Sequence, residues 1–102
     1  MAKYRVADQA RDDLDEIWRY TAVEWSVDQA ELFTQQFHDR FQSLAEQPRG
    51  GRSRPDLGSD LRSVPLLSFV IVYRPTDYGI EIVHIVHGHR RLESLFRQRT
   101  NL

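Results

Sequence analysis

Side chains that can carry charge or move protons cluster near the end of the chain, in the segment His87, Gly88, His89, Arg90 and Arg91. Two further arginines, Arg62 and Arg74, belong to β-type segments that precede it. A histidine can accept the proton of an RNA 2′-hydroxyl, and arginines can stabilise the charge that develops on the attacked phosphate. RNA cleavage is therefore one chemistry open to a site made of His87, Arg62, Arg74, Arg90 and Arg91. A hydrolase triad is disfavoured, because no nucleophile lies beside a base and an orienting acid.

Three histidines at positions 84, 87 and 89 suggest a second chemistry, which is metal binding. On a strand His84 and His87 would point to opposite faces, and no acidic or cysteine ligand lies at a useful spacing from them. The chain also has no cysteine, which excludes a zinc ribbon and a disulfide framework. We therefore expect neither a metal nor a cofactor.

The strands that must position these residues are predicted from runs of β-branched side chains. One run extends from Ser68 to Arg74 and the next from Ile80 to Val86, and a shorter run starts at Leu61 and is expected to end at Pro65. The segment 75–79 between the longer runs has the composition of a turn. Connections this short predict an antiparallel meander.

Strand alternation predicts which side chains share a face of this sheet. In the first long run, one face takes Phe69, Ile71 and Tyr73, and the other takes Val70, Val72 and Arg74. In the next run, Ile80, Ile82, His84 and Val86 lie opposite to Glu81, Val83, Ile85 and His87. Because helices can cover only one face, the other face is expected to remain a semi-exposed apolar strip edged by arginine, which marks a partner site.

Two helices are predicted before the sheet, after a short strand at Tyr4 to Val6. Asp8 is the expected N-cap of the first helix, and Ser26 with Gln29 forms a capping box for the second. The apolar stripe of the first helix is Ala10, Leu14, Ile17, Trp18, Thr21 and Trp25. That of the second is Ala30, Phe33, Phe37, Phe41 and Leu44, with Pro48 closing the helix. The short break between the helices predicts an antiparallel hairpin whose aromatic residues pack on the sheet.

The whole chain is predicted to be one α+β domain over residues 1–102, in the order β-α-α-β-β-β. A glycine and arginine connection, 49–58, joins the hairpin to the sheet. A short helix carrying Leu92, Leu95 and Phe96 is expected after Gly88, with a frayed tail over 97–102. No segment reaches signal-peptide or membrane-helix length, so we expect a cytoplasmic protein.

Charge divides unequally between the two halves of the chain, although the net charge is only −1. Residues 1–48 carry 5 basic and 10 acidic side chains, and residues 49–102 carry 9 basic and 5 acidic ones. All 9 are arginine, the planar donor suited to carboxylate and phosphate. The arginine-rich half therefore favours an acidic partner.

Together these segments resemble the ParE branch of the RelE/ParE toxin superfamily. The resemblance rests on the order of five pieces: Asp13 to Tyr20, the arginine loop ending Arg54, Pro55, Asp56 and Leu57, Leu61 with Arg62, Tyr73 with Arg74, and His87 to Arg90. It implies a helical hairpin on a small, mainly antiparallel sheet. It also implies the toxin of a type II toxin–antitoxin pair, silenced by a ParD-like or other antitoxin.

The resemblance leaves two targets open, because ParE toxins poison DNA gyrase whereas RelE relatives cut messenger RNA on the ribosome. The long helical hairpin with Trp18 and Trp25 and the low net charge favour gyrase, since phosphate attraction dominates binding to RNA. Direct nucleic-acid binding is then not expected outside the antitoxin complex. A non-toxic module that only binds an antitoxin is the third possibility, and the ribonuclease remains the alternative enzyme.

The partner-binding surface is assigned to Arg62, Tyr73, Arg74, His87, Arg90 and Arg91. A competing interpretation is purely structural. In it, Arg62 or Arg74 pairs with Asp60 or Glu81 and holds the sheet together.

Overall fold

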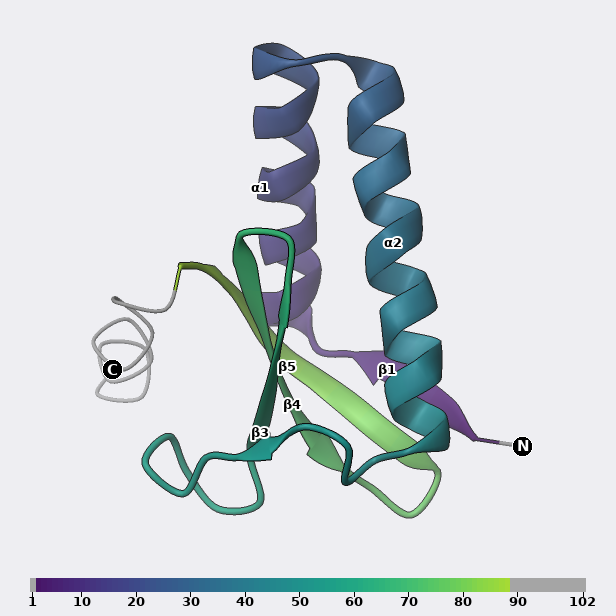
Figure 1. The fold of residues 1–102 in the computed structure, drawn as a ribbon, viewed down its shortest axis with the longest axis vertical. Coiled ribbons are helices and arrows are strands. Elements are labelled where there is room, and N and C mark those ends of the chain that lie inside the picture. Colours follow the sequence, from purple (N-terminus) through teal and green to yellow (C-terminus); the bar gives the residue numbers. More distant parts are fainter. Residues whose placement is uncertain (1, 89–102) are drawn as a thin grey trace.

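The fold is a helical hairpin packed on a five-stranded sheet, given by a computed structural model that describes residues 2–88 (Figure 1). The elements in chain order are β1 (Lys3–Val6), α1 (Asp8–Glu24), α2 (Val27–Glu46), β2 (Arg52–Ser53), β3 (Arg62–Leu66), β4 (Phe69–Pro75) and β5 (Gly79–His87). The sheet order is β1-β5-β4-β3-β2. Among the strands of residues 2–88 only the β1 and β5 pair is parallel, so the predicted α+β class and mainly antiparallel sheet are confirmed. The predicted C-terminal helix and the tail at 97–102 lie outside the described residues.

The helix starts follow local capping rules with one exception. Ser26 accepts a hydrogen bond from the Gln29 N–H at 3.0 Å and caps α2 as predicted. Asp8, predicted as the N-cap of α1, is instead its first helical residue, and Ala7 occupies the cap without a side-chain bond. The Asp8 carboxylate still lies at the positive end of the helix.

The main core lies between the helices and one face of the sheet. Phe37 and Phe41 of α2 are fully buried against Ile71 and Tyr73 of β4 and against Ile80 and neighbours of β5. Phe69 of β4 meets Phe37 edge to face at 5.7 Å between ring centres. The predicted stripe of α2 is therefore confirmed, with Phe33 only partly buried.

The second face of the sheet is not the open strip that alternation led us to expect. Val70, Val72 and Val86 are buried there together with Leu61, and Leu57 of the connecting loop packs on them. The glycine and arginine connection thus contributes to the cover of this face through Leu57. The apolar partner site predicted from these valines is thus wrong.

A bulge in β5 also changes which side chains face the helices. Val72 pairs with His84 while Tyr73 pairs with Ile82, so Val83 has no opposite residue on β4. One extra residue shifts the alternation of every residue after it. Consequently Ile85, predicted to lie opposite Ile82, joins the main core with it, and Val86 joins the second face.

Pro65 does not end β3 as predicted, because the strand continues to Leu66. β2 pairs only with Arg62 and Ser63, so Pro65 lies on an edge with no outer neighbour. An edge position tolerates a residue that lacks an N–H.

The far end of the helical hairpin extends beyond the sheet (Figure 1). Trp25, predicted as a core residue of the first helix, lies there and is 76% exposed. Trp18 is partly buried in a depression between α1 and α2, with Leu14 and Val6 beside it. Helical periodicity alone assigned Trp25 to the buried stripe, but the sheet is too short to reach it.

Candidate partner-binding surface

The loop after α2 is fastened to the sheet by Tyr73, one of the predicted site residues. Its hydroxyl accepts a hydrogen bond from the Gly51 N–H at 2.8 Å and donates one to the Pro48 carbonyl at 2.9 Å. Gly51 is required because a Cβ there would lie 2.4 Å from that hydroxyl oxygen. Tyr73 is fully buried and offers no surface to a partner. It acts here as an anchor for the loop.

Burial also changes the acidity of this phenol. Loss of solvation raises the pKa of Tyr73 above its ordinary value of 10.0. The Gly51 hydrogen bond and the charges of Arg62 and Arg40 lower the pKa, but they offset only part of the rise. The neutral, hydrogen-bonding phenol is therefore the form that the folded protein favours.

Arg62 supports the same loop from β3. Its Nη1 donates to the Gly51 carbonyl at 2.8 Å and to the Arg49 carbonyl at 3.3 Å. The guanidinium is partly buried and also lines a shallow depression of about 490 Å³ with Arg49, Ser53 and Asp60. Arg62 thus bonds backbone carbonyls rather than Asp60, and it still presents positive charge to this depression.

Arg74 is exposed and pairs across the strands with Glu81, with Nε 3.6 Å from the carboxylate. This is the structural pairing that the sequence allowed as an alternative. A solvent-exposed pair of this kind stabilises the sheet by about 0–1 kcal/mol. Arg74 is therefore held loosely and could exchange Glu81 for an acidic group of a partner.

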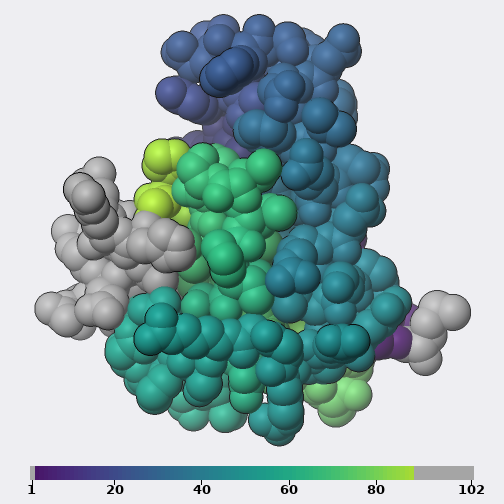
Figure 2. All heavy atoms as spheres, in the orientation of Figure 1, coloured from purple at the N-terminus to yellow at the C-terminus, as the bar shows by residue number. Residues whose placement is uncertain are grey.

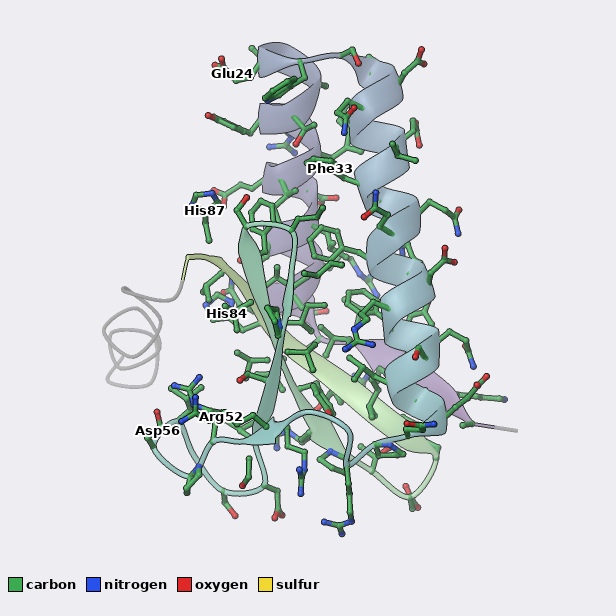
Figure 3. The ribbon with its side chains drawn as sticks, viewed as in Figure 1. Glu24, Phe33, Arg52, Asp56, His84 and His87 are labelled. Atoms are coloured by element: carbon green, nitrogen blue, oxygen red, sulfur yellow. The ribbon has the colours of Figure 1, made fainter. Side chains whose placement is uncertain are left out.

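His87 lies at the other end of β4 from these arginines. It pairs with Phe69 in the sheet ladder, and the two rings meet edge to face at 5.0 Å. Phe69 and Arg74 are five residues apart on one strand, which is about 17 Å at 3.3 Å per residue. The strand pairing thus places Arg62, Tyr73 and Arg74 near one end of β4 and His87 near the other. Figure 3 labels His87 near the tip of the β3–β4 hairpin. Arg90 and Arg91 lie outside the described residues.

Two comparisons with known proteins agree on the family. The family model described as the ParE toxin of the type II toxin–antitoxin system, parDE, matches residues 4–92. The chain belongs to the ParE toxin family. It is 31% identical over 87 residues to toxin ParE1 of Caulobacter vibrioides, covering 85% of this chain and 90% of that protein. Toxin ParE1 of Mycobacterium tuberculosis H37Rv is 31% identical over 87 residues, with 84% and 89% covered.

A solved structure supports the ParE fold independently. A chain of the chromosomal ParDE toxin–antitoxin system from P. aeruginosa superposes with a TM-score of 0.74. It covers 87% of this chain and 98% of the solved one at 22% identity. Sequence identity at that level supports a shared fold and nothing further.

Two further exposed arginines of this ParE family member lie in the loop after α2. Arg49 and Arg52 are exposed, and neither forms an ion pair with another residue in the range 2–88. Arg54, by contrast, is held by Asp56 at 2.8 Å. The density of arginine in the segment 49–54 was the signal that could have identified them. We call Arg49, Arg52 and Arg62 the arginine surface.

A buried polar pair between α1 and β5 was not predicted from the sequence. The carboxylate of Asp13 on α1 meets Nδ1 of His84 and accepts a hydrogen bond from the Ile85 N–H at 2.9 Å. Asp13 lies three residues after buried Ala10, in phase with the apolar stripe, and an acid at such a position indicates a buried partner. His84 is therefore part of the junction between helix and sheet.

No group of three or more His, Cys, Asp or Glu side chains in residues 2–88 is arranged to hold a metal ion. None of the helices there is long and apolar enough to cross a membrane.

Proposed function

We propose that this ParE family toxin is neutralised by a ParD-like antitoxin and that, when free, it inhibits DNA gyrase and so blocks replication. Membership of a family defined by the parDE pair supports an antitoxin partner. Because replication is a cytoplasmic process, we expect the toxin to act there.

The observation that carries the choice of target is the separation of His87 from Arg62 and Arg74 along β4. Ribonuclease chemistry needs a base and charge-stabilising groups within a few ångströms of one phosphate. A spacing of about 17 Å along a strand keeps His87 from acting on one phosphate together with Arg62 or Arg74. Arg62 is in addition bonded to the backbone carbonyls of Arg49 and Gly51, so its guanidinium is engaged in the fold. This arrangement favours a toxin that binds a protein over one that cuts RNA.

The antitoxin is expected to bind at the arginine surface. Arg49 and Arg52 are exposed cations without ion pairs among the described residues, and the depression beside Arg62 could hold a carboxylate. The outer edge of β3 beyond β2 is open over 64–66, where an extended segment could add as a strand. An acidic, disordered antitoxin tail fits both features.

Purified gyrase tests the target directly. We expect the toxin to make gyrase accumulate cleaved DNA from supercoiled plasmid and the antitoxin to prevent this. Unchanged supercoiling in excess toxin would contradict the proposal. Cut messenger RNA after induction would support the ribonuclease instead, and harmless expression without antitoxin would support the non-toxic module.

Charge reversal tests the antitoxin surface. Arg49→Glu with Arg52→Glu should slow antitoxin association about 10-fold at low salt, with the loss shrinking as salt rises. Arg19→Glu on exposed α1 is the matched control and should leave the rate unchanged. Equal rates for both variants and the wild type would show that the acidic tail binds elsewhere.

A further inference from the structure

Large apolar side chains gather around the turn between α1 and α2, where more than half of each is exposed. Val23 is 81% exposed and Trp25 is 76% exposed. Tyr20, Val27 and Leu32 are each more than half exposed. Single exposed apolar residues are normal, but five of them within residues 20–32, one a tryptophan, are a concentration of the kind that marks an interaction site. We call these five residues the hairpin-tip patch.

The fold does not require these residues to be apolar. The tip stands clear of the sheet and of the β3–β4 hairpin on the face shown in the space-filling view (Figure 2). Ser26 caps α2 through its hydroxyl, and Trp25 closes α1 through its backbone N–H, which bonds the Thr21 carbonyl. Neither contact uses the indole ring. The exposed Trp25 side chain therefore contributes little to stability and remains available for binding.

The charge around the patch indicates what binds it. Residues 20–32 contain Glu24, Asp28 and Glu31 and no lysine or arginine, a local charge of −3. A second copy of the chain would bring these acids against each other. An acidic antitoxin tail would be repelled as well, and the arginine surface that attracts it lies at the opposite end, as the positions of Glu24 and Arg52 show (Figure 3).

We propose that the hairpin-tip patch docks the toxin's target through an apolar protein segment flanked by lysine or arginine. This inference rests on the proposed function and names the surface that recognises gyrase. Trp25 is the anchor, because tryptophan dominates binding energy when a partner buries it. The acids Glu24, Asp28 and Glu31 form the rim that meets the basic flanks. Target and antitoxin then occupy different ends of the molecule.

Substitution of the anchor tests this arrangement. Trp25→Ser and Val23→Ser should each fold with an unchanged melting temperature, because the side chains are exposed. Trp25→Ser should require about 30-fold more toxin for half-maximal gyrase inhibition, the loss typical of an anchor residue. Antitoxin affinity should stay at the wild-type value. Tyr78→Ser, which changes an exposed aromatic residue in the β4–β5 turn, is the control and should inhibit as the wild type does.

Results that differ from these expectations would overturn different claims. Wild-type toxin without effect on gyrase would overturn the proposed function and this inference with it. Inhibition by the wild type and equally by Trp25→Ser would overturn the inference alone. Parallel loss of antitoxin binding would assign the patch to the antitoxin, and a wild-type dimer that Trp25→Ser dissociates in sedimentation would assign it to a second copy.

Discussion

Asp13 and His84 are joined across the junction of helix and sheet, 71 residues apart in sequence. The same carboxylate oxygen of Asp13 also accepts the Ile85 N–H, and both side chains are at most 5% exposed. Burial of a polar group is costly unless a partner satisfies it, so this contact stabilises only one register of α1 on β5. It orients the helical hairpin, and through it the hairpin-tip patch, relative to the sheet.

Asp13→Ala should lower the free energy of unfolding by about 3 kcal/mol, because it leaves the Ile85 N–H and the His84 ring buried without this acceptor. Urea denaturation followed by circular dichroism measures the loss. Asp12→Ala removes the neighbouring exposed acid and should change stability by less than about 0.5 kcal/mol. Similar values for the two variants would show that the buried pair contributes no more than a surface carboxylate.

Tyr73→Phe should lower the free energy of unfolding by about 1–3 kcal/mol, since the Gly51 N–H and the Pro48 carbonyl lose their partner. The raised pKa also predicts a pH effect. The folded state holds the phenolic proton more tightly than the unfolded chain, so this stabilisation is complete below about pH 10 and is lost as pH rises through the folded pKa. The urea concentration at the midpoint of unfolding should fall as pH rises from 8 to 11, and it should fall more steeply for the wild type than for Tyr73→Phe. Parallel slopes would contradict the raised pKa.

Gly79→Ala should detach β1 from the sheet, because a Cβ at Gly79 would lie 1.9 Å from the Lys3 carbonyl oxygen. Its φ of 148° is also unfavourable for alanine. Hydrogen exchange should show loss of protection at the Lys3 and Ala7 amides, which bond Tyr78 and Ile82. Gly88→Ala is the control, since its φ of 79° brings strain but no atom lies within 4 Å. It should cost only about 1 kcal/mol and leave β1 protected.

Leu67→Gly should stabilise the protein by about 0.5–1 kcal/mol. Leu67 occupies the tip of the β3–β4 hairpin at φ 56°, a conformation that costs a leucine about 1–2 kcal/mol, and its side chain is half exposed. Thermal unfolding would register the gain as a higher melting temperature. Ser68→Gly at the adjacent tip position should bring no gain, because Ser68 does not adopt a positive φ. A lower melting temperature for Leu67→Gly would mean that the leucine contacts outweigh the strain.

Much of the fold was predictable because it depends on local spacing. The phase of Phe37 and Phe41, the Ser26 cap and the β-branched runs each follow from a few neighbouring residues. The bulge at Val83 was not predictable, because an unpaired residue shows only against its partner strand. The alternation predicted for Ile85 therefore failed.

The candidate site was predicted less well than the fold. The sequence assigned Arg62, Tyr73 and Arg74 to a partner-binding surface, and the strand pairing places them near one end of β4. It could not show that Tyr73 faces inward to anchor the loop, or that Arg49 and Arg52 are the exposed cations of the same surface. Those facts depend on how the loop closes over the sheet.

The sequence by itself determined the family, the two amphipathic helices and the unequal charge of the two halves, because composition and short-range periodicity are properties of the chain. Only the tertiary structure decided where those charges and apolar residues face. The sheet ends before Trp25 and leaves it exposed, and the length of β4 holds His87 away from Arg74. Distances between residues far apart in sequence are set by strand order and by contacts such as that of Asp13 with His84, which local rules do not encode.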